Sequence, residues 1–426
     1  MKKYLAIVTP SMLLVVLLFS FISAKQPEHV KIEHAKKVQF PQPESAEAYF
    51  PDIHKRRLTD AIKKYFDKAV KNKQIVGASV AIVKCDSIIY SGGFGHRNIA
   101  LKNKVNSETV FRIGSVSKGF AGILAGIHVE DGLINWEDRI VDHIPGFKLA
   151  NKTNTDQVTI SNVLSHTSGL PYHSFTNLVE DGLSLSTIAG RFNEVLPLDK
   201  PGSIYNYQNA VFALSGEIIE RKTGKLLKDI IQERIFNPLQ METASASYEA
   251  LQESDNVALP HQKVRYGWRS KPINKKYYNA VAAGGVNASA RDMGKWMKFL
   301  LGNNPEVLMP KVIEDVFTPV VQVGGRRNYY QRWPGYNSSF YGMGWRIHEF
   351  KDDNTKGINK VIHHGGGVNN YRSEIALFPN EDLGICVLFN SPNKLAKNCI
   401  PELHKIIEEV LNIPTKEVFK TSLVAL

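Results

Sequence analysis

The chain has 426 residues, of which 43% are hydrophobic and 22% charged, with 31 Gly and 20 Pro. This composition is typical of a globular protein and excludes collagen-like, coiled-coil and disordered chains. The length predicts two or three structural units, or one enzyme with a sizeable insertion. A formal net charge of +12 suits contact with an anionic membrane, wall polymer or nucleic acid, but an ordinary basic soluble protein carries such a charge equally well.

Residues 1–24 have the pattern of an export signal. Two lysines precede an apolar stretch that is densest over Met12–Phe19, and Ala24 supplies a small residue for cleavage. We therefore expect an exported protein, periplasmic or extracellular, that stays anchored in the membrane only where the signal is retained. Residues 25–56, rich in proline, charge and histidine, are expected to form a leader or linker.

One domain is expected over residues 57–415, followed by a tail at 416–426. Both ends of this domain show strand patterns, and the part between them is richer in helix and loop signals. An antiparallel sheet built from about 57–110 and 340–415, with a helical insertion between them, accounts for this order. The elements that carry this prediction are a helix at Leu58–Val70, strands at Gly77–Lys84 and Ser87–Tyr90 joined at Cys85–Asp86, strands at Glu374–Phe378 and Leu383–Phe389, and a closing helix at Pro401–Leu411.

The three cysteines, Cys85, Cys386 and Cys399, give little information. An odd number in an exported chain allows one bridge at most and leaves one thiol free. Cys85 follows one predicted strand and Cys386 lies inside another, so each is expected to be a small buried hydrophobic residue. The sequence predicts no particular disulfide.

Two segments mix basic and aromatic residues, Lys263–Lys276 and Arg326–Trp333. Such mixing can stack bases and contact phosphates, but no RNA-binding or helix-turn-helix signature accompanies either segment. We expect solvated loops at the rim of a cleft, and no nucleic-acid partner.

The usual motifs of metal, phosphate and dinucleotide sites are absent from the sequence. It has no His-Glu-x-x-His, no Cys-x-x-Cys, no Walker A pattern and no Gly-x-Gly-x-x-Gly, so we expect no metal and no cofactor. The Gly-x-Ser-x-Gly elbow of α/β-hydrolases is missing as well.

The pattern Ser-x-x-Lys occurs twice. Ser115 and Lys118 precede a glycine-rich apolar stretch that predicts a buried helix. A serine at a helix start faces unpaired N–H groups, and a lysine three residues on lies one turn away on the same face. This spacing puts an amine beside the hydroxyl that it would activate. A helix cap with a surface lysine is the alternative for this pair, and Ser391–Lys394, in a turn, is expected to be a surface loop.

The pattern Tyr-x-Asn also occurs twice. Tyr207 and Asn209 precede an apolar helical stretch and would project from a turn toward a common point. A phenol can shuttle a proton when a nearby cation lowers its pKa, and a carboxamide can hold both a substrate carbonyl and the lysine. The other copy, Tyr277–Asn279, is expected to be structural.

A glycine-rich run at His363–Gly367 enters a predicted strand. Residues without side chains let a substrate lie along the strand edge with backbone N–H groups directed at it. A glycine-rich β-bulge beside a buried or metal-binding histidine pair is the alternative.

In combination and in this order, the three motifs resemble the serine β-lactamase and penicillin-binding protein family, specifically its class C-like branch with its D,D-peptidase and esterase relatives. Segments 164–171, 283–292 and 341–345 are similar to the same family. The resemblance spans roughly Leu58–Leu411. It implies an α/β (α+β) fold, in which an antiparallel sheet flanked by helices carries an inserted all-helical domain and the site lies in the groove between them.

The resemblance also implies a role for most of the motif residues. Ser115 would be the acylated nucleophile, Lys118 its activating partner and Tyr207 the acid/base. The backbone N–H groups of Ser115 and Gly367 would form the oxyanion hole, and Asn209 would contact the substrate amide.

His364 and Gly366 would be further substrate-binding residues. His364 falls where class C β-lactamases have the lysine of Lys-Thr-Gly, and a histidine there looks more like D,D-peptidases, D-amino-acid peptidases and esterases. An imidazole that holds a substrate carboxylate would lose its charge near the ordinary histidine pKa of about 6.5.

The sequence therefore predicts an exported serine hydrolase that forms an acyl-enzyme with β-lactam or D-Ala-D-Ala-like peptide substrates. An esterase or D-amino-acid peptidase of the same fold is the first alternative. A non-catalytic module that binds penicillin or the cell wall is the second, and the intact Ser115, Lys118 and Tyr207 argue against it. The expected partners are a small β-lactam or a peptidoglycan-derived peptide, with contact to an anionic membrane or wall surface.

Overall fold

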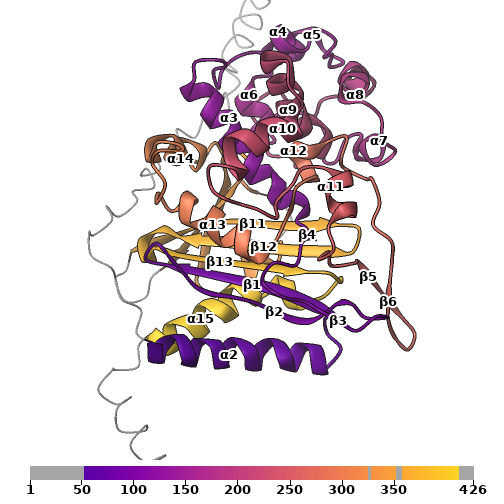
Figure 1. Ribbon diagram of the computed structural model, residues 1–426. Coiled ribbons are helices and arrows are strands. Elements are labelled where there is room, and N and C mark those ends of the chain that lie inside the picture. The colour runs from indigo at the N-terminus through magenta and orange to yellow at the C-terminus, as the bar shows by residue number, and fades with distance from the viewer. Residues whose placement is uncertain (1–51, 325–327, 352–356, 412–426) are drawn as a thin grey trace, which may run out of the picture. The chain divides into compact units, whose positions relative to one another are not determined.

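The computed structural model describes residues 52–324, 328–351 and 357–411 (Figure 1). The predicted signal peptide, most of the predicted leader and the predicted tail lie outside these residues. None of the described helices combines the length and the hydrophobicity that a membrane span needs.

The two ends of the described chain share one antiparallel sheet, as the sequence predicts. β1 pairs with β13 in a register that places Ala81 opposite Cys386, and the strand order is β3-β2-β1-β13-β12-β11-β10-β9-β8. The C-terminal part of the sheet begins with β8 at Val321, before the predicted start at about residue 340. Its nine strands are β1 (Gly77–Lys84), β2 (Ser87–Asn98), β3 (Asn103–Lys104), β8 (Val321–Gln322), β9 (Tyr336–Tyr341), β10 (Arg346–Lys351), β11 (Ile358–Val368), β12 (Tyr371–Phe378) and β13 (Leu383–Phe389).

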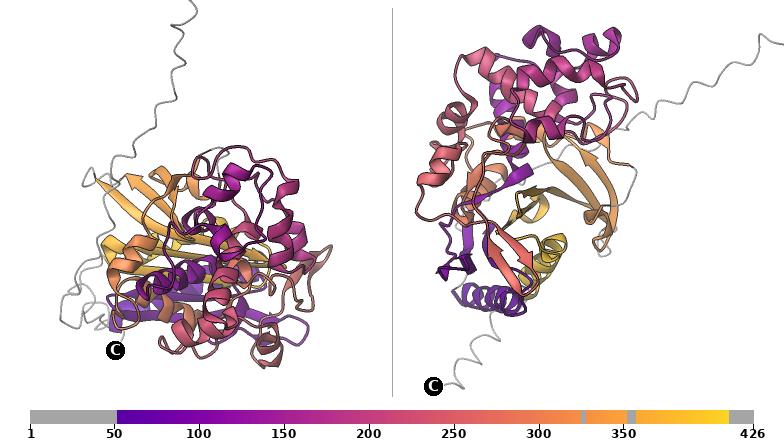
Figure 2. Two further views of the ribbon diagram at one scale, coloured as in Figure 1. Left: turned by 90° about the horizontal axis from the view of Figure 1, so that it is seen from above. Right: turned by 90° about the vertical axis from the view of Figure 1, so that its right-hand side faces the viewer.

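Helices cover both faces of this sheet, which explains why β1 is apolar along nearly its whole length. Val80 and Ile82 face the layer of α2 (Asp52–Lys71) and α15 (Cys399–Leu411), whereas Ala81 and Val83 face α13 (Ala290–Leu300) and the helical layer beyond it (Figures 1 and 2). Helix α2 begins before the predicted Leu58, so the last residues of the predicted leader are helical.

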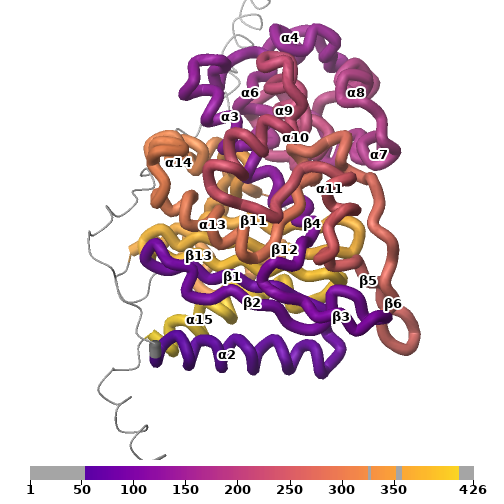
Figure 3. Tube along the Cα trace, in the orientation of Figure 1, coloured from indigo at the N-terminus to yellow at the C-terminus, as the bar shows by residue number. Residues whose placement is uncertain are grey.

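The middle of the chain is helical and lies on the α13 side of the sheet, as Figures 1 and 3 show. Helix α3 (Ser117–Glu130) runs from the sheet into it. Its other helices are α4 (Ile140–His143), α5 (Lys152–Gln157), α6 (Ile160–Leu164), α7 (Thr176–Glu180), α8 (Leu185–Arg191), α9 (Asn209–Thr223), α10 (Leu227–Ile231), α11 (Tyr248–Glu253), α12 (Val281–Gly284) and α14 (Pro310–Val316), with the short strand pairs β4 (Phe111–Arg112) with β7 (Asn287–Ala288) and β5 (His261–Val264) with β6 (Gly267–Ser270). Single helical turns complete the structure: the 3-10 turns η2 (Gly114–Val116) and η3 (Phe192–Glu194), the π-helical turn η4 (Gln232–Phe236) and, in the C-terminal part of the chain, the 3-10 turns η5 (Tyr330–Arg332), η6 (Pro379–Glu381) and η7 (Leu395–Lys397).

The two basic and aromatic segments differ from each other. Lys263–Lys276 contains the β5–β6 hairpin, and Tyr266 at its tip is exposed, as expected for a solvated loop. In the second segment, Tyr330 and Trp333 are buried in the layer between the sheet and α2. The prediction of a solvated loop is wrong there, because these rings fill the core beside β10 and β11.

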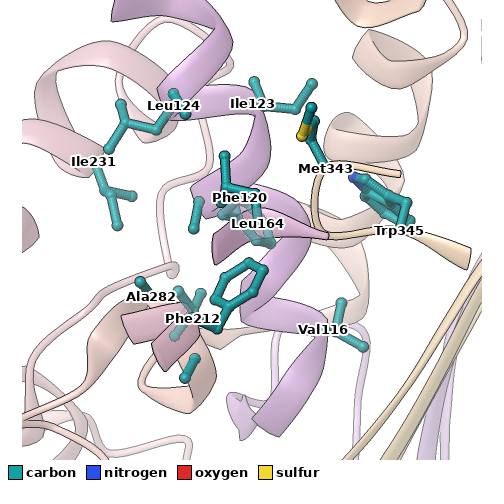
Figure 4. Close-up of a cluster of buried hydrophobic side chains, with 14 of the residues drawn as sticks. Val116, Phe120, Ile123, Leu124, Leu164, Phe212, Ile231, Ala282, Met343 and Trp345 are labelled. Atoms are coloured by element: carbon teal, nitrogen blue, oxygen red, sulfur yellow. The ribbon is translucent and has the colours of Figure 1, made fainter. Parts of the chain in front are cut away.

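Glycines on one face of α3 let this helix lie against the segment between β9 and β10. A Cβ at Gly122 would collide with the carbonyl oxygen of Met343, and one at Gly119 would collide with the ring of Trp345. Figure 4 shows Met343 and Trp345 beside α3 within a cluster of buried side chains. Because Gly119 and Gly122 have no side chains, α3 can approach the sheet closely.

We expect Gly122→Ala to lower the free energy of unfolding by about 1–3 kcal/mol, because the new methyl group meets a backbone carbonyl that cannot rotate away. Gly190→Ala in α8 is the matched control. Its nearest neighbour would be the carbonyl oxygen of Gly146 at 3.6 Å, an ordinary contact, and alanine gains up to about 1 kcal/mol of helix propensity. Denaturant unfolding measures both variants, and equal stabilities would contradict this account of the packing.

Candidate active site

Ser115 lies in the turn η2, just before α3, at the junction of the sheet and the helical layer. The preceding Gly114 has φ +54°, and a Cβ there would lie 2.8 Å from the backbone nitrogen of Gly367. Glycine at this position therefore lets the turn that carries Ser115 pack against β11. Ser115 is partly exposed, and the helix starts at Ser117 rather than at the serine itself.

β11 offers an open edge next to this turn. Its pairing with β10 ends at His363, so within the described part of the chain no strand pairs with the following residues of β11 on that side. A Cβ at Gly366 would collide with the carbonyl oxygen of Ile113, and Gly367 is exposed. The glycines thus allow close packing against η2, and Gly367 stays exposed at this edge.

Lys118 is completely buried one turn after Ser115. Its Nζ donates hydrogen bonds to Asn209 Oδ1 and to the carbonyl oxygen of Ala283, both at 2.8 Å, and lies 3.5 Å from Ser115 Oγ. Burial, followed by the nearby charge of Arg346, lowers the pKa of Lys118 well below its ordinary value. The alternative of a surface lysine is therefore excluded by its position, and the environment favours the neutral amine.

Tyr207 is buried beside both residues. Its ring centroid lies 4.8 Å from Lys118 Nζ, and its hydroxyl lies close enough to Ser115 for the two to interact. Burial raises the pKa of Tyr207, although the charge of Arg346 and the interaction with Ser115 oppose that shift. The phenol consequently keeps its proton at neutral pH and is placed to donate it.

Asn209 connects Lys118 to a tyrosine that the sequence assigns a purely structural role. Asn209 Nδ2 donates to the hydroxyl of Tyr277 at 3.2 Å, and this hydroxyl donates to Glu180 Oε1 at 3.4 Å. Asn279, in contrast, bonds only backbone carbonyls of the α7–α8 region and is structural. Tyr277 therefore contacts the site through Asn209, and this contact depends on long-range packing that a local pattern does not reveal.

His364 is buried and fully hydrogen-bonded. Its Nδ1 donates to the carbonyl oxygen of Gly365 at 2.9 Å, and its Nε2 accepts from the hydroxyl of Tyr341 at 3.0 Å. A carbonyl can only accept, so Nδ1 carries the proton. Burial, with Arg346 and Lys118 nearby, lowers the pKa of His364 well below its ordinary range. The expected loss of charge near pH 6.5 is therefore wrong, because the imidazole is already neutral there.

Ser391 is not part of a surface loop. It is completely buried, and its Oγ accepts a hydrogen bond from the backbone N–H of Val76 at 3.2 Å. The prediction of a surface loop is wrong for this serine. It has a structural role at the end of β13, away from the site around Ser115.

His363 and His364 are both buried, as the alternative of a buried histidine pair predicts. His363 belongs to a buried chain of polar side chains whose other members local sequence does not reveal. Ser339 Oγ and His348 Nδ1 are 2.8 Å apart, His348 Nε2 and His363 Nδ1 are 3.0 Å apart, and His363 Nε2 lies 2.8 Å from Glu374 Oε2. The hydroxyl of Tyr329 also donates to the carboxyl group of Glu374. Burial raises the pKa of Glu374 to about 8.

We expect wild-type stability to fall relative to Glu374→Gln as the pH rises from about 4.5 to about 8. The folded carboxyl group, with a pKa of about 8, holds a proton that the unfolded one, with its ordinary pKa of 4.5, has lost. Its stabilising contribution is therefore complete below pH 4.5 and disappears as the pH passes 8, a change on the order of a few kcal/mol.

Glutamine reproduces the protonated carboxyl group because it can donate to His363 and accept from Tyr329. Denaturant unfolding of both proteins at a series of pH values gives the comparison. Parallel curves would show that Glu374 does not titrate in this range.

The described residues contain no group of three His, Cys, Asp or Glu side chains placed to hold a metal ion. Cys85, Cys386 and Cys399 are free thiols, the last two completely buried. Burial raises the pKa of both buried thiols.

Comparison with known proteins shows the family and the fold of the chain. The family model described as Beta-lactamase matches residues 62–404. Protein flp of Staphylococcus aureus (strain N315) is 26% identical over 363 residues, which cover 82% of this chain and 67% of that protein. Unguisins hydrolase ungD' of Aspergillus campestris (strain IBT 28561) is 26% identical over 360 residues, which cover 80% of this chain and 63% of that relative, so the chain spans less than two thirds of its length.

Among solved structures, the octameric penicillin-binding protein homologue from Pyrococcus abyssi aligns with a TM-score of 0.70 at 24% identity, over 82% of this chain and 77% of that one. The fold is thus that of the β-lactamases and penicillin-binding proteins. The chain belongs to the Beta-lactamase family, whose model matches most of its length. The resemblance and the fold class predicted from the sequence are confirmed.

Proposed function

We propose that the protein is an exported serine hydrolase that forms an acyl-enzyme at Ser115 with β-lactam or D-Ala-D-Ala-like peptide substrates. The observation that carries the proposal is the position of Lys118 Nζ, 3.5 Å from Ser115 Oγ and bonded to two carbonyl oxygens. Export rests on the pattern of residues 1–24. The net charge of +12 suits an anionic membrane or wall surface nearby.

Lys118 activates the nucleophile Ser115, because burial lowers the pKa of the lysine amine and favours its neutral form. A neutral Lys118 gives its two N–H groups to Asn209 and Ala283, which leaves its lone pair for the hydroxyl of Ser115. As Ser115 Oγ bonds to the substrate carbonyl carbon, its proton passes to Nζ. The negative charge on the carbonyl oxygen is held by the backbone N–H groups of Ser115 and Gly367.

Tyr207 completes the reaction because its hydroxyl is close to Ser115 and keeps its proton at neutral pH. It protonates the leaving group as the substrate bond breaks, and Lys118 returns the proton to the phenol. Water then attacks the acyl-serine and gives its proton to the phenol oxygen of Tyr207, while the phenol passes its own proton to the neutral Lys118. Ser115 Oγ takes this proton from Lys118 as the acyl bond breaks. Asn209 has one amide hydrogen left for the substrate, which would lie along the β11 edge at Gly366, and the neutral His364 orients Tyr341 beneath it.

An esterase or D-amino-acid peptidase is the second candidate, and the neutral state of His364 favours it. Class C β-lactamases, which the sequence resembles, have a lysine at this position, whereas the buried imidazole has no charge with which to hold a carboxylate at neutral pH. A non-catalytic binding module is disfavoured, because a binding surface gains nothing from a serine with a buried amine beside it.

We expect Ser115→Ala to abolish covalent labelling by a fluorophosphonate and by a penicillin, while the melting temperature stays close to that of the wild type. Ser115 is partly exposed and its hydroxyl supports no buried backbone group, so the loss should be chemical. Intact-protein mass spectrometry measures the adduct. Ser391→Ala is the control, since that serine also belongs to a Ser-x-x-Lys but is buried. A label that persists on Ser115→Ala, or that depends on Ser391, would refute the assignment.

A further inference from the structure

His166 is a buried histidine beside Tyr207, and the proposed reaction gives it no role. It comes shortly after α6, and 2% of its surface is exposed. The centroid of its imidazole ring lies 4.2 Å from that of Tyr207, 4.8 Å from that of Tyr341 and 5.2 Å from that of Phe212. The imidazole therefore packs directly against the phenol that the proposed function uses as an acid.

The hydrogen bonds of His166 define the position of its proton. Its Nδ1 lies 3.1 Å from the backbone nitrogen of Gln208, and a backbone N–H can only donate, so Nδ1 is the acceptor. Burial, followed by the charges of Lys118 and Arg346, lowers the pKa of His166 well below its ordinary value. The imidazole is consequently neutral at neutral pH, with its proton on Nε2 and with the lone pair of Nδ1 already bonded to Gln208.

Packing alone does not explain a histidine at this position. The Nε2 of His166 is buried, and no described residue accepts a hydrogen bond from it. Such an unpaired N–H costs about 1–3 kcal/mol of folding free energy, which a hydrophobic ring would avoid. His166 also has φ +62°, in the left-handed region that few residues with a side chain adopt. The bond that Nδ1 makes is therefore the feature that requires an imidazole here.

This one residue holds the backbone on both sides of Tyr207. The carbonyl oxygen of His166 accepts the N–H of Asn206 at 2.9 Å, and its Nδ1 accepts the N–H of Gln208. The left-handed backbone turns the carbonyl oxygen and the imidazole toward the same short segment. The side chain of Gln208 adds a further bond, to the carbonyl oxygen of Pro171 at 2.6 Å. The path of the chain through Tyr207 is therefore fixed by His166 and its neighbours.

We propose that His166 is a positioning residue, which holds Tyr207 so that its hydroxyl reaches the leaving group of the substrate. The inference rests on the proposed function, in which Tyr207 protonates this group. A displacement of about 1 Å at a reacting group can lower the rate about 100-fold, so a phenol that is free to move would be a poor acid. His166 itself transfers no proton, because it is neutral and the lone pair of its Nδ1 is already bonded.

The test compares the 4-nitrophenyl ester and the ethyl ester of N-acetyl-D-alanine, which share the acyl group. Nitrophenolate leaves without a proton, whereas an alkoxide needs one, and kcat/KM reports the acylation step. We expect His166→Ala to lower kcat/KM of the ethyl ester by roughly 10- to 100-fold and that of the nitrophenyl ester by at most about threefold. His166→Asn should cause a smaller loss of the same kind, because asparagine can accept the N–H of Gln208 and tolerates a positive φ.

His261→Ala is the matched control for the loss of a buried imidazole. His261 lies in β5 and is completely buried, and its Nε2 accepts the backbone N–H of Ile99 at 3.2 Å. We expect this variant to lose a comparable amount of stability in denaturant unfolding and to keep the wild-type ratio of the two kcat/KM values. In a Tyr207→Phe background, where the phenol hydroxyl is absent, His166→Ala should leave the ratio unchanged.

The outcomes separate this inference from the proposed function. If the variants of His166 slow both esters equally, or if His261→Ala changes the ratio as much as His166→Ala does, the positioning role is refuted and the hydrolase function stands. A wild-type ratio in His166→Asn refutes it as well, whether or not His166→Ala folds. If Tyr207→Phe itself leaves the ratio unchanged, or if neither ester nor fluorophosphonate modifies Ser115 in the wild type, the proposed function fails at that step and this inference fails with it.

Discussion

The burial of one amine, that of Lys118, is the constraint on which the arrangement of this protein depends. Its two hydrogen-bond acceptors, Asn209 Oδ1 and the carbonyl oxygen of Ala283, are 91 and 165 residues away in sequence. They reach it only because α9 and α12 pack against α3, and α3 in turn lies close to the sheet through its glycines at Gly119 and Gly122. The fold thus brings distant segments together around a single nitrogen, which loses its charge more easily than a lysine in water.

Burial also determines the protonation of the groups around it. It keeps the phenol of Tyr207 protonated, it leaves His364 neutral between a carbonyl oxygen and Tyr341, and it favours the uncharged form of Lys118. Arginine is the exception, because a guanidinium group keeps its charge in almost any environment. The site therefore combines neutral groups suited to proton transfer with a fixed positive charge at Arg346.

Much of this arrangement could be predicted from local sequence. Ser115 and Lys118 are one turn apart, Tyr207 precedes an apolar helix, and the hairpin strands alternate as buried strands do, so short-range spacing was sufficient for these elements. Local sequence does not predict the other features of the site. The contact of Tyr277 with Asn209, the burial of Tyr330, and the neutral state of His364 all result from packing between segments far apart in the chain. Protonation in particular depends on desolvation, which no motif encodes.

The central claim is that Lys118 acts on Ser115 as a neutral amine, and an NMR titration of Lys118 Nζ tests it most directly. Protein labelled with 15N in its lysine side chains would be titrated with base, and the resonance assigned by its absence from Lys118→Met. The account predicts a midpoint well below the ordinary lysine pKa of 10.5, set by burial first and by Arg346 second. A midpoint at or above that ordinary value would contradict it, because the amine would then be charged and have no lone pair for the hydroxyl proton of Ser115.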